Sequence, residues 1–401
     1  MLFMGKHRPW WGAPKNFSER KHERKIGWLE LFFDLVYVAA IGQLTHNVAA
    51  HPSFHTVAFS FLLFSLVFWS WVNGSQYYDL HGNDGLRTRL LTFWQMLAMA
   101  AVSITISDAF EGNHKPFAIT FMMLQLMITY LWWSVGYYDK EHRKYNIFYT
   151  THYSISFILL LISVFTTADT ATVLWIIVFL FNATPPLTVA RRVVSELKKQ
   201  GQVFSASAAI VERFGLLTII IMTESILSTV SGIEGFKDKQ PAMWIAFILG
   251  ILISFLLWNI YFDMTSEQET KKGYKYMQLL IFIHFPLLAS LSIIGASIKV
   301  LLINMEHELP RGVEWMFCIA LFILLYSIVA LTKIMQEDAE ERSYIKPVSR
   351  KLLICGACVL IIPLIGNLHT LEFMGIVAFI LFIPVVVGVR AWIKYKYGEV
   401  K

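Results

Sequence analysis

Charged residues are scarce in this sequence of 401 residues. Only 15% of them are charged, whereas a soluble domain carries about 25%. Hydrophobic residues make up 56% of the chain, and the mean hydropathy is +0.55. One soluble core cannot enclose so much apolar surface. The scarcity of charge therefore excludes an ordinary soluble globular protein and indicates repeated membrane-spanning helices.

Cysteine is nearly absent, which argues against a disulfide-rich protein and against a cysteine-ligated metal site. The three cysteines are Cys318, Cys355 and Cys358, and all of them fall inside apolar runs. The pair in C-G-A-C has neither a second pair nor a nearby histidine, as a zinc site would require. We therefore expect packing residues, with no disulfide framework and no metal site.

Several catalytic and nucleotide-binding motifs are also missing. The chain has no phosphate-binding loop, no G-x-S-x-G elbow and no dinucleotide fingerprint. We therefore predict no enzymatic activity and no cofactor, and an enzyme acting on lipid is the least favoured function. The net charge of +6 lies in segments between apolar runs, so it predicts membrane topology and no nucleic-acid partner.

The apolar runs between polar breaks number twelve, each about long enough to cross a bilayer. Their short connections make neighbouring spans antiparallel. The predicted spans cover about 28–50, 55–77, 90–110, 117–138, 147–167, 171–190, 208–231, 241–263, 277–303, 313–333, 351–367 and 371–393.

The number of lysine and arginine residues is alternately high and low in successive segments between the spans. With the N-terminus inside, 28 of the 34 basic residues fall in inner segments and only four in outer loops. Positive charge favours the cytoplasmic side. The count therefore predicts that both termini are cytoplasmic, with the lipid bilayer as the main partner.

The two halves of the chain resemble each other at a nearly constant offset. Glu30 falls on Glu212 at a shift of 182 residues, and Asp79 falls on Asp263 at a shift of 184. This predicts an all-α polytopic protein built from two parallel six-helix repeats. The predicted parts are a basic N-terminal arm at 1–27, a first repeat at 28–190, an amphipathic linker at 191–207, a second repeat at 208–393 and a tail at 394–401.

The first span carries two acids one helical turn apart, so they share a face. Glu30 lies in the first turn, where the helix dipole favours negative charge, and we expect it mainly to hold the helix end to basic loops. Asp34 lies deeper, where an unpaired charge is costly. It therefore needs a partner, a proton or water, and function and structure explain it equally well.

The seventh predicted span carries Glu212, Arg213 and Glu224. Arg213 and Glu224 share a face but lie about 16 Å apart along the axis at 1.5 Å per residue, so they cannot pair within one helix. Arg213 is expected to pair with Glu212 or with Asp34. Glu224 is the most deeply placed acid in the chain, and its default interpretation is a functional site.

Four other residues are secondary candidates. Asp79 and Asp263 end matching Y-[YF]-D motifs and can pair with Arg87 or Lys271. Asp108 lies near an outer span end, where acids usually meet water. His284 lies inside a span, where histidine is usually hydrogen-bonded packing and can also relay protons.

Two of these stretches carry a family resemblance. W-L-E-L-F-F-D-L-V at Trp28 to Val36 and E-R-F-G-L-L-T-I-I-I-M-T-E-S-I-L at Glu212 to Leu227 resemble the bacterial low temperature requirement protein A family. The likeness covers essentially the whole chain. It implies a multi-pass inner-membrane protein linked by name to growth in the cold, and it implies no particular biochemical activity.

These observations leave two main hypotheses for the function. In the first, the chain is an ion- or proton-coupled permease, with a cavity between the repeats lined by Asp34, Glu224, Arg213 and Glu30. A cation, a proton or a small molecule is then the substrate, and the acids carry it. In the second, the chain is a sensor or assembly factor whose buried charges are structural pairs between helices.

Overall fold

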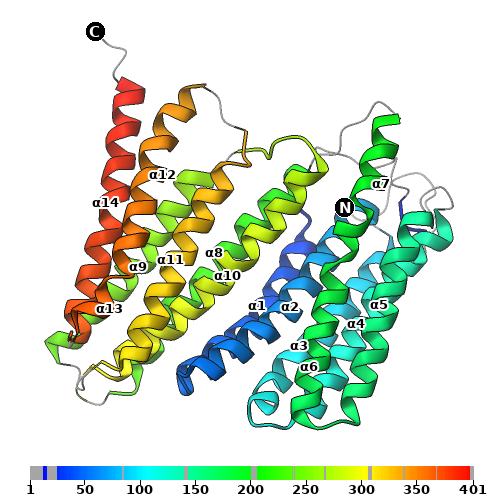
Figure 1. Ribbon diagram of the computed structural model, residues 1–401, viewed down its shortest axis with the longest axis horizontal. Helices are drawn as coiled ribbons and strands as arrows, with labels where there is room; N and C mark the ends of the chain where they lie inside the picture. Colours follow the sequence, from blue (N-terminus) through cyan, green and yellow to red (C-terminus); the bar gives the residue numbers. More distant parts are fainter. Residues whose placement is uncertain are drawn as a thin grey trace, which may run out of the picture. The chain divides into compact units, whose positions relative to one another are not determined.

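Every regular element of the protein is a helix, apart from one isolated β-bridge, within the residues that the computed structural model describes (Figure 1). These are residues 12–15, 25–83, 85–139, 143–199, 206–236, 238, 240–265, 268–305, 309–336, 339–366 and 368–397. The helices are α1 (Trp28–Ala50), α2 (Phe54–His81), α3 (Leu86–Phe110), α4 (His114–Tyr138), α5 (Arg143–Val164), α6 (Ala168–Ala183), α7 (Pro185–Lys199), α8 (Ala208–Glu234), α9 (Pro241–Thr265), α10 (Tyr274–Ile303), α11 (Arg311–Thr332), α12 (Ala339–Val359), α13 (Ile362–Ile365) and α14 (Thr370–Tyr397).

Twelve segments of the described chain are long and apolar enough to cross a membrane. This confirms the predicted all-helical, polytopic class and the predicted number of spans. The sixth span combines α6 with the start of α7, and the eleventh combines most of α12 with α13. The chain is therefore a multi-pass membrane protein.

The chain forms two compact units. The first unit comprises residues 1–43, 62–213 and 272–278. The second comprises residues 44–61, 214–271 and 279–401.

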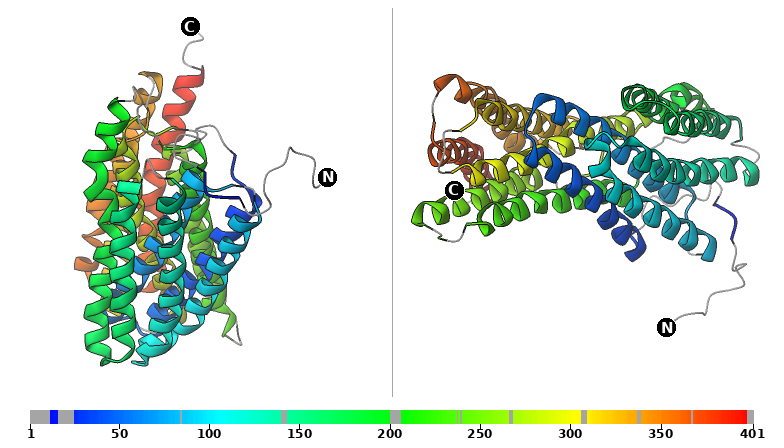
Figure 2. Two further views of the ribbon diagram at one scale, coloured as in Figure 1. Left: turned by 90° about the vertical axis from the view of Figure 1, so that its right-hand side faces the viewer. Right: turned by 90° about the horizontal axis from the view of Figure 1, so that it is seen from below.

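Consecutive helices pack side by side in the first unit, where α4 contacts both α3 and α5, and α5 contacts α6. Figure 2 shows α4 to α6, coloured cyan to green, running lengthwise beside one another. Buried amides join α4 to α6, because Gln125 and Asn182 donate to each other's carbonyl oxygens at 3.2 and 2.9 Å. Tyr153 of α5 donates to Asn73 of α2. Such paired polar groups connect helices that are apolar elsewhere.

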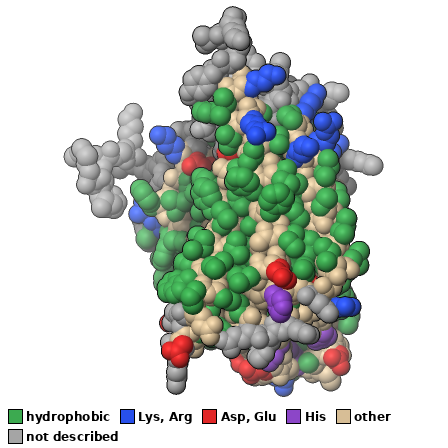
Figure 3. Space-filling view, turned by 90° about the vertical axis from the view of Figure 1, so that its left-hand side faces the viewer, with side chains coloured by type: hydrophobic (Ala, Val, Ile, Leu, Met, Phe, Trp, Pro, Cys, Tyr) green, Lys and Arg blue, Asp and Glu red, His purple; other side chains and the backbone are tan. Residues whose placement is uncertain are grey.

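In the second unit, α14 packs against both α9 and α12, and α11 packs against α12. Hydroxyl pairs join other helices of this unit: Thr45 with Ser292 at 2.7 Å, and Ser225 with Ser254 at 2.9 Å. Figure 3 shows hydrophobic side chains covering the middle of one face of this unit, with Lys and Arg gathered mainly at its upper end. This distribution is typical of a membrane protein's surface.

Several helices extend beyond the apolar runs from which they were predicted. The eleventh span was predicted to begin at 351, yet α12 begins at Ala339 and continues through Pro347. Similarly, α2 ends at His81 and α3 begins at Leu86. The added turns are polar, and hydropathy detects the membrane-embedded part of a helix and misses its polar extension.

The linker between the predicted repeats is helical in part. Helix α7 begins at Pro185, inside the predicted sixth span, because Pro185 and Pro186 lack the N–H groups that would continue α6. It covers the predicted amphipathic linker as far as Lys199, while residues 200–205 lie outside the described part of the chain. The predicted basic arm lies largely outside it as well, as residues 1–11 and 16–24 do.

Candidate functional site

Two buried acids of the first unit, Asp34 and Glu30, converge on one arginine. Arg213 lies in the second turn of α8 and is 1% exposed, and Asp34 of α1 is fully buried. Arg213 donates from Nη2 to Asp34 Oδ1 at 2.5 Å and from Nε to Asp34 Oδ2 at 3.2 Å. This two-point contact matches the planar guanidinium to the planar carboxylate. Of the two partners predicted for Arg213, the structure has Asp34.

Glu30 is the second acid of this cluster. Its Oε1 accepts a hydrogen bond from Arg213 Nη1 at 3.3 Å, and both side chains are buried. Its Oε2 accepts from the backbone N–H of Gly27 at 2.9 Å, so the third residue of α1 reaches back to the residue that caps it. We expected Glu30 mainly to bind basic loops. Among the described residues it caps its own helix and binds the same arginine as Asp34, while most of the basic N-terminal arm lies outside them.

Aromatic rings enclose the cluster. Trp71 of α2 donates from Nε1 to Asp34 Oδ1 at 2.7 Å, so both carboxylate oxygens of Asp34 are hydrogen-bonded. The Arg213 guanidinium lies 5.5 Å from the ring of Trp71 and 5.6 Å from the ring of Phe33. These cation–π contacts stabilise the buried positive charge of Arg213.

Replacing Trp71 with phenylalanine tests the indole hydrogen bond. The substitution keeps an aromatic face beside Arg213 and removes one donor to a buried carboxylate. We expect the free energy of unfolding to fall by about 1–3 kcal/mol, the usual cost of a lost hydrogen bond to a charged group. Denaturation in mixed micelles followed by circular dichroism measures it. The change Trp94→Phe, at a half-exposed indole of α3, is the matched control and should have little effect. Equal stability of the two variants would contradict the assigned role of Trp71.

A small cavity of about 10 Å³ lies beside this cluster, lined by Glu30 and Arg213 together with Tyr77, Thr92 and Gln95. That volume admits about one water molecule. Gln95 Oε1 is buried and has no hydrogen-bond donor among the described residues. A water here would bind both the glutamine oxygen and the charged cluster.

Glu224 lies on α8 in the second unit and contrasts with Asp34. It lies 16 residues beyond the first residue of a 27-residue helix, or about 24 Å along its axis at 1.5 Å per residue. Its side chain is half-buried and makes no hydrogen bond or ion pair with any described residue. The backbone at Glu224 and Ser225 lies against Gly295 of α10. Glu224 is thus a partly accessible acid near the middle of a span.

Comparison with known proteins now adds to this geometry. The family model described as bacterial low temperature requirement A protein matches residues 25–387, which include the Asp34 cluster and Glu224. The chain belongs to this family. An uncharacterized protein of Rhizobium meliloti (strain 1021) is 23% identical over 258 residues, which are 64% of this chain and 63% of that protein. The match therefore spans less than two thirds of the relative's length.

Three other acids of this low temperature requirement A chain make no side-chain hydrogen bond or ion pair in the described structure: Glu212, Asp108 and Asp263. Glu212 is exposed on α8, so the alternative pairing of Arg213 with Glu212 is wrong. Asp263 is not paired with Lys271, whose Nζ donates to the backbone oxygen of Lys333 at 2.7 Å. These acids are separate from the buried cluster.

Asp79 and Arg87, which the sequence suggested as a possible pair, instead have other partners. Asp79 accepts a hydrogen bond from Ser207 Oγ at 2.5 Å, and both residues are buried. Arg87 donates to Tyr77 Oη at 3.1 Å and to Ser134 Oγ at 2.6 Å. Two nitrogens of the Arg87 guanidinium therefore donate to hydroxyl groups, which the Y-Y-D motif alone does not reveal.

His284 occupies the packed interior of the second unit. Its Nδ1 contacts the backbone oxygen of Leu280 at 2.8 Å, and its Nε2 contacts Tyr261 Oη at 3.0 Å. Its ring lies 4.5 Å from that of Phe214. Because a carbonyl oxygen only accepts, Nδ1 donates to it. Both nitrogens are occupied, as expected for a hydrogen-bonded core histidine.

Sequence reasoning missed the neutral members of the Asp34 cluster. Trp71 and Phe33 lie in apolar runs where aromatic residues are common, so neither stood out. The one available signal was chemical: an indole N–H within a span needs an acceptor, and Asp34 is the only carboxylate between residues 31 and 78. Composition and spacing do not reveal the cation–π contacts.

Proposed function

We propose that this low temperature requirement A protein is a non-enzymatic permease of the bacterial inner membrane that moves a proton or a small cation. Its termini lie in the cytoplasm, and its two six-helix halves arose by duplication. The alternation of basic residues along the chain supports the orientation. The matching acids near the start of each half support the duplication.

Glu224 carries this proposal. It is a carboxylate within a membrane span, partly accessible and without a described partner. An isolated charge in hydrocarbon is costly, so such an acid must take up a proton, bind a cation or reach water. Each of these states is a step that a permease uses. Glu224 is therefore the group that binds and releases the transported ion.

The Asp34 cluster has a different role in the proposal. Asp34 already has three hydrogen bonds, two from Arg213 and one from Trp71. Exchange of an ion at Asp34 would require breaking this arrangement. Asp34 and Glu30 therefore hold Arg213 in place and set the local charge. Asp34 and Glu224 were both expected to carry the substrate, and we now assign that role to Glu224 alone.

Ion flux into liposomes tests the proposal. Full-length protein is reconstituted, and proton, sodium and potassium fluxes are followed with ion-sensitive dyes. We expect Glu224→Gln to reduce the flux of the transported ion to the level of protein-free liposomes, because the amide cannot exchange a proton or bind a cation by charge. The control is Glu234→Gln, which makes the same change at an exposed position of the same helix and should keep wild-type flux.

Two results would contradict the proposal. One is wild-type flux of every ion in the Glu224→Gln protein. The other is wild-type protein that moves none of the three ions above the protein-free background. The second result would favour a sensor or assembly factor in which the buried charges only join helices. The two hydrogen bonds from Arg213 to Asp34 fit such a structural role.

A further inference from the structure

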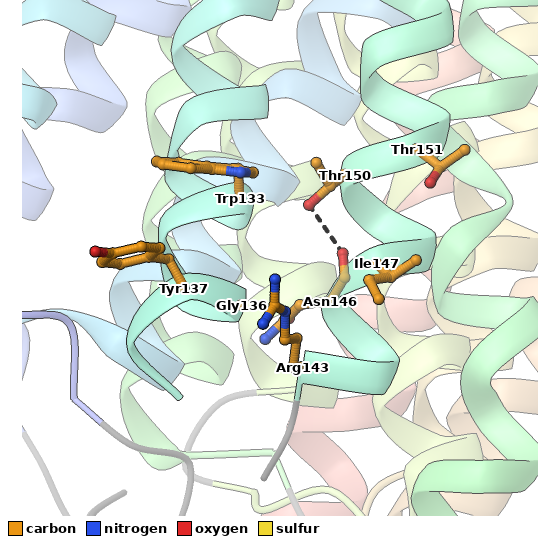
Figure 4. A pocket seen from close by; sticks show the side chains of 8 residues that line it. All are labelled: Trp133, Gly136, Tyr137, Arg143, Asn146, Ile147, Thr150 and Thr151. Atoms are coloured by element: carbon orange, nitrogen blue, oxygen red, sulfur yellow. Dashed lines mark hydrogen bonds between the residues drawn. The ribbon is translucent and has the colours of Figure 1, made fainter. Parts of the chain in front are cut away.

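A pocket of about 200 Å³ lies between α4 and α5 in the first unit, apart from the buried cluster. Figure 4 shows Trp133 and Tyr137 of α4 on one side and Asn146 and Thr150 of α5 on the other, with Arg143 at the lower end. The pocket exceeds the needs of a single ion and is smaller than the roughly 300–1,000 Å³ of typical sites for drug-sized ligands. Its size suits a small polar group.

Arg143 supplies a positive charge that no described residue pairs with. The side chain is exposed and makes no hydrogen bond or ion pair with the described residues. Its stem lies near Gly136, where an added Cβ would be 3.9 Å from Arg143 Cγ and 3.2 Å from Asn146 Cβ. Among the described residues, none that lines the pocket is acidic, and the lining consists of Trp133, Gly136, Tyr137, Arg143, Asn146, Ile147, Thr150 and Thr151.

Asn146 gives independent support for a ligand. It is only 5% exposed, it lines the pocket, and its side-chain amide has no hydrogen-bond partner in the described structure. Buried amides normally have partners. Two hydroxyls lie along the same wall: Thr150 donates to the backbone oxygen of Asn146 at 2.9 Å, and Thr151 is exposed. A guanidinium, an amide and the Thr151 hydroxyl together form a donor set for an oxyanion.

The aromatic wall indicates which oxyanion fits. Trp133 and Tyr137 are 50% and 62% exposed, and their rings stack with centroids 5.6 Å apart. They lie in the last two turns of one span, and Arg143 lies three residues before the next span begins at Asn146. The pocket is therefore at the boundary between hydrocarbon and water, where tryptophan and tyrosine contact lipid head groups.

We propose that this pocket binds the phosphate group of an anionic phospholipid, such as phosphatidylglycerol. The phosphate oxygens accept hydrogen bonds from Arg143 and from the Asn146 amide. The glycerol and the first acyl carbons lie against Trp133 and Tyr137. The net negative charge of the lipid is matched by Arg143, whereas a zwitterionic lipid brings a positive choline group into the same pocket.

Binding of a fluorescent short-chain phosphatidylglycerol to the full-length protein in maltoside micelles tests the site. We expect Arg143→Gln to weaken binding by about tenfold or more, the effect of losing one charge-assisted hydrogen bond. Asn146→Leu should weaken it severalfold without changing any charge. Lys144→Gln is the matched control: this exposed neighbour has the same charge but does not line the pocket, so affinity should not change.

Competition identifies the source of the phosphate. Unlabelled phosphatidylglycerol should displace the probe, while phosphatidylcholine and soluble glycerol 3-phosphate should displace it poorly. Equal losses in Arg143→Gln and Lys144→Gln, or full affinity in Asn146→Leu, would show surface electrostatics and overturn the proposal. Displacement by glycerol 3-phosphate as effective as by the lipid would also overturn it, in favour of a soluble ligand. Gel filtration and circular dichroism establish that each variant is folded.

Discussion

Replacing Arg213 with methionine is expected to lower the free energy of unfolding by about 3–5 kcal/mol, the usual cost of removing one member of a buried ion pair. Methionine fills much of the same volume, so packing is largely kept. The loss arises because Asp34 and Glu30 remain buried without the guanidinium that bonds both of them. Trp71 supplies the one remaining side-chain donor to Asp34 among the described residues.

A second variant separates charge from packing. Combining Asp34→Asn with Arg213→Met removes both members of the pair, so it should recover part of the stability lost in Arg213→Met alone. Recovery should be incomplete because Glu30 is unchanged. The control Arg390→Met makes the same substitution at an exposed position of α14 and should change stability by less than about 1 kcal/mol.

Unfolding in mixed micelles by increasing amounts of dodecyl sulfate, followed by circular dichroism, measures all three proteins. Similar stabilities of Arg213→Met and Arg390→Met would show that the cluster does not stabilise the fold. A double variant as unstable as Arg213→Met would show that the loss comes from packing rather than from the unpaired carboxylate.

The number of spans was predictable because hydropathy measures how apolar a segment is, and the bilayer core accepts only apolar segments. An apolar run of about 20 residues has few alternatives to a spanning helix. The same measure is insensitive to polar helix ends, so the predicted eleventh span begins at 351 although α12 already begins at Ala339, and α7 was not separated from α6. Proline at 185 and 186 was a usable signal for that second boundary.

The partners of the charged residues were less predictable. The position of Asp34 within a span showed that it needs a partner, and the scarcity of charged residues left few candidate partners for Arg213. However, the two residues are 179 positions apart in the chain. Which side chains meet across such a separation depends on helix rotation, and the sequence does not show rotation directly. The same reason explains Arg87, which contacts hydroxyl groups of Tyr77 and Ser134 where Asp79 was expected.

The contact between α8 and α10 supports a further prediction about glycine. Gly295 lies beside Glu224 and Ser225, and Gly232 lies beside Leu302, so residue numbers rise together and the helices run in the same direction. Small residues permit such close approach between membrane helices. At Gly232 an added Cβ would be 2.8 Å from Leu302 Cβ, an atom fixed to the backbone. At Gly295 the nearest atoms would be 3.4–3.5 Å away, an ordinary contact.

Alanine should therefore be destabilising at Gly232 and tolerated at Gly295. Gly232→Ala forces α8 and α10 apart, and we expect a net loss of about 1–3 kcal/mol in the free energy of unfolding, as for an overpacked core. Gly295→Ala fits without displacement and should be neutral or stabilising by up to about 1 kcal/mol, because alanine favours the helix. The same micelle unfolding assay compares the two. Equal stability would show that the helices adjust freely, and a loss confined to Gly295→Ala would place the closest approach beside Glu224 instead.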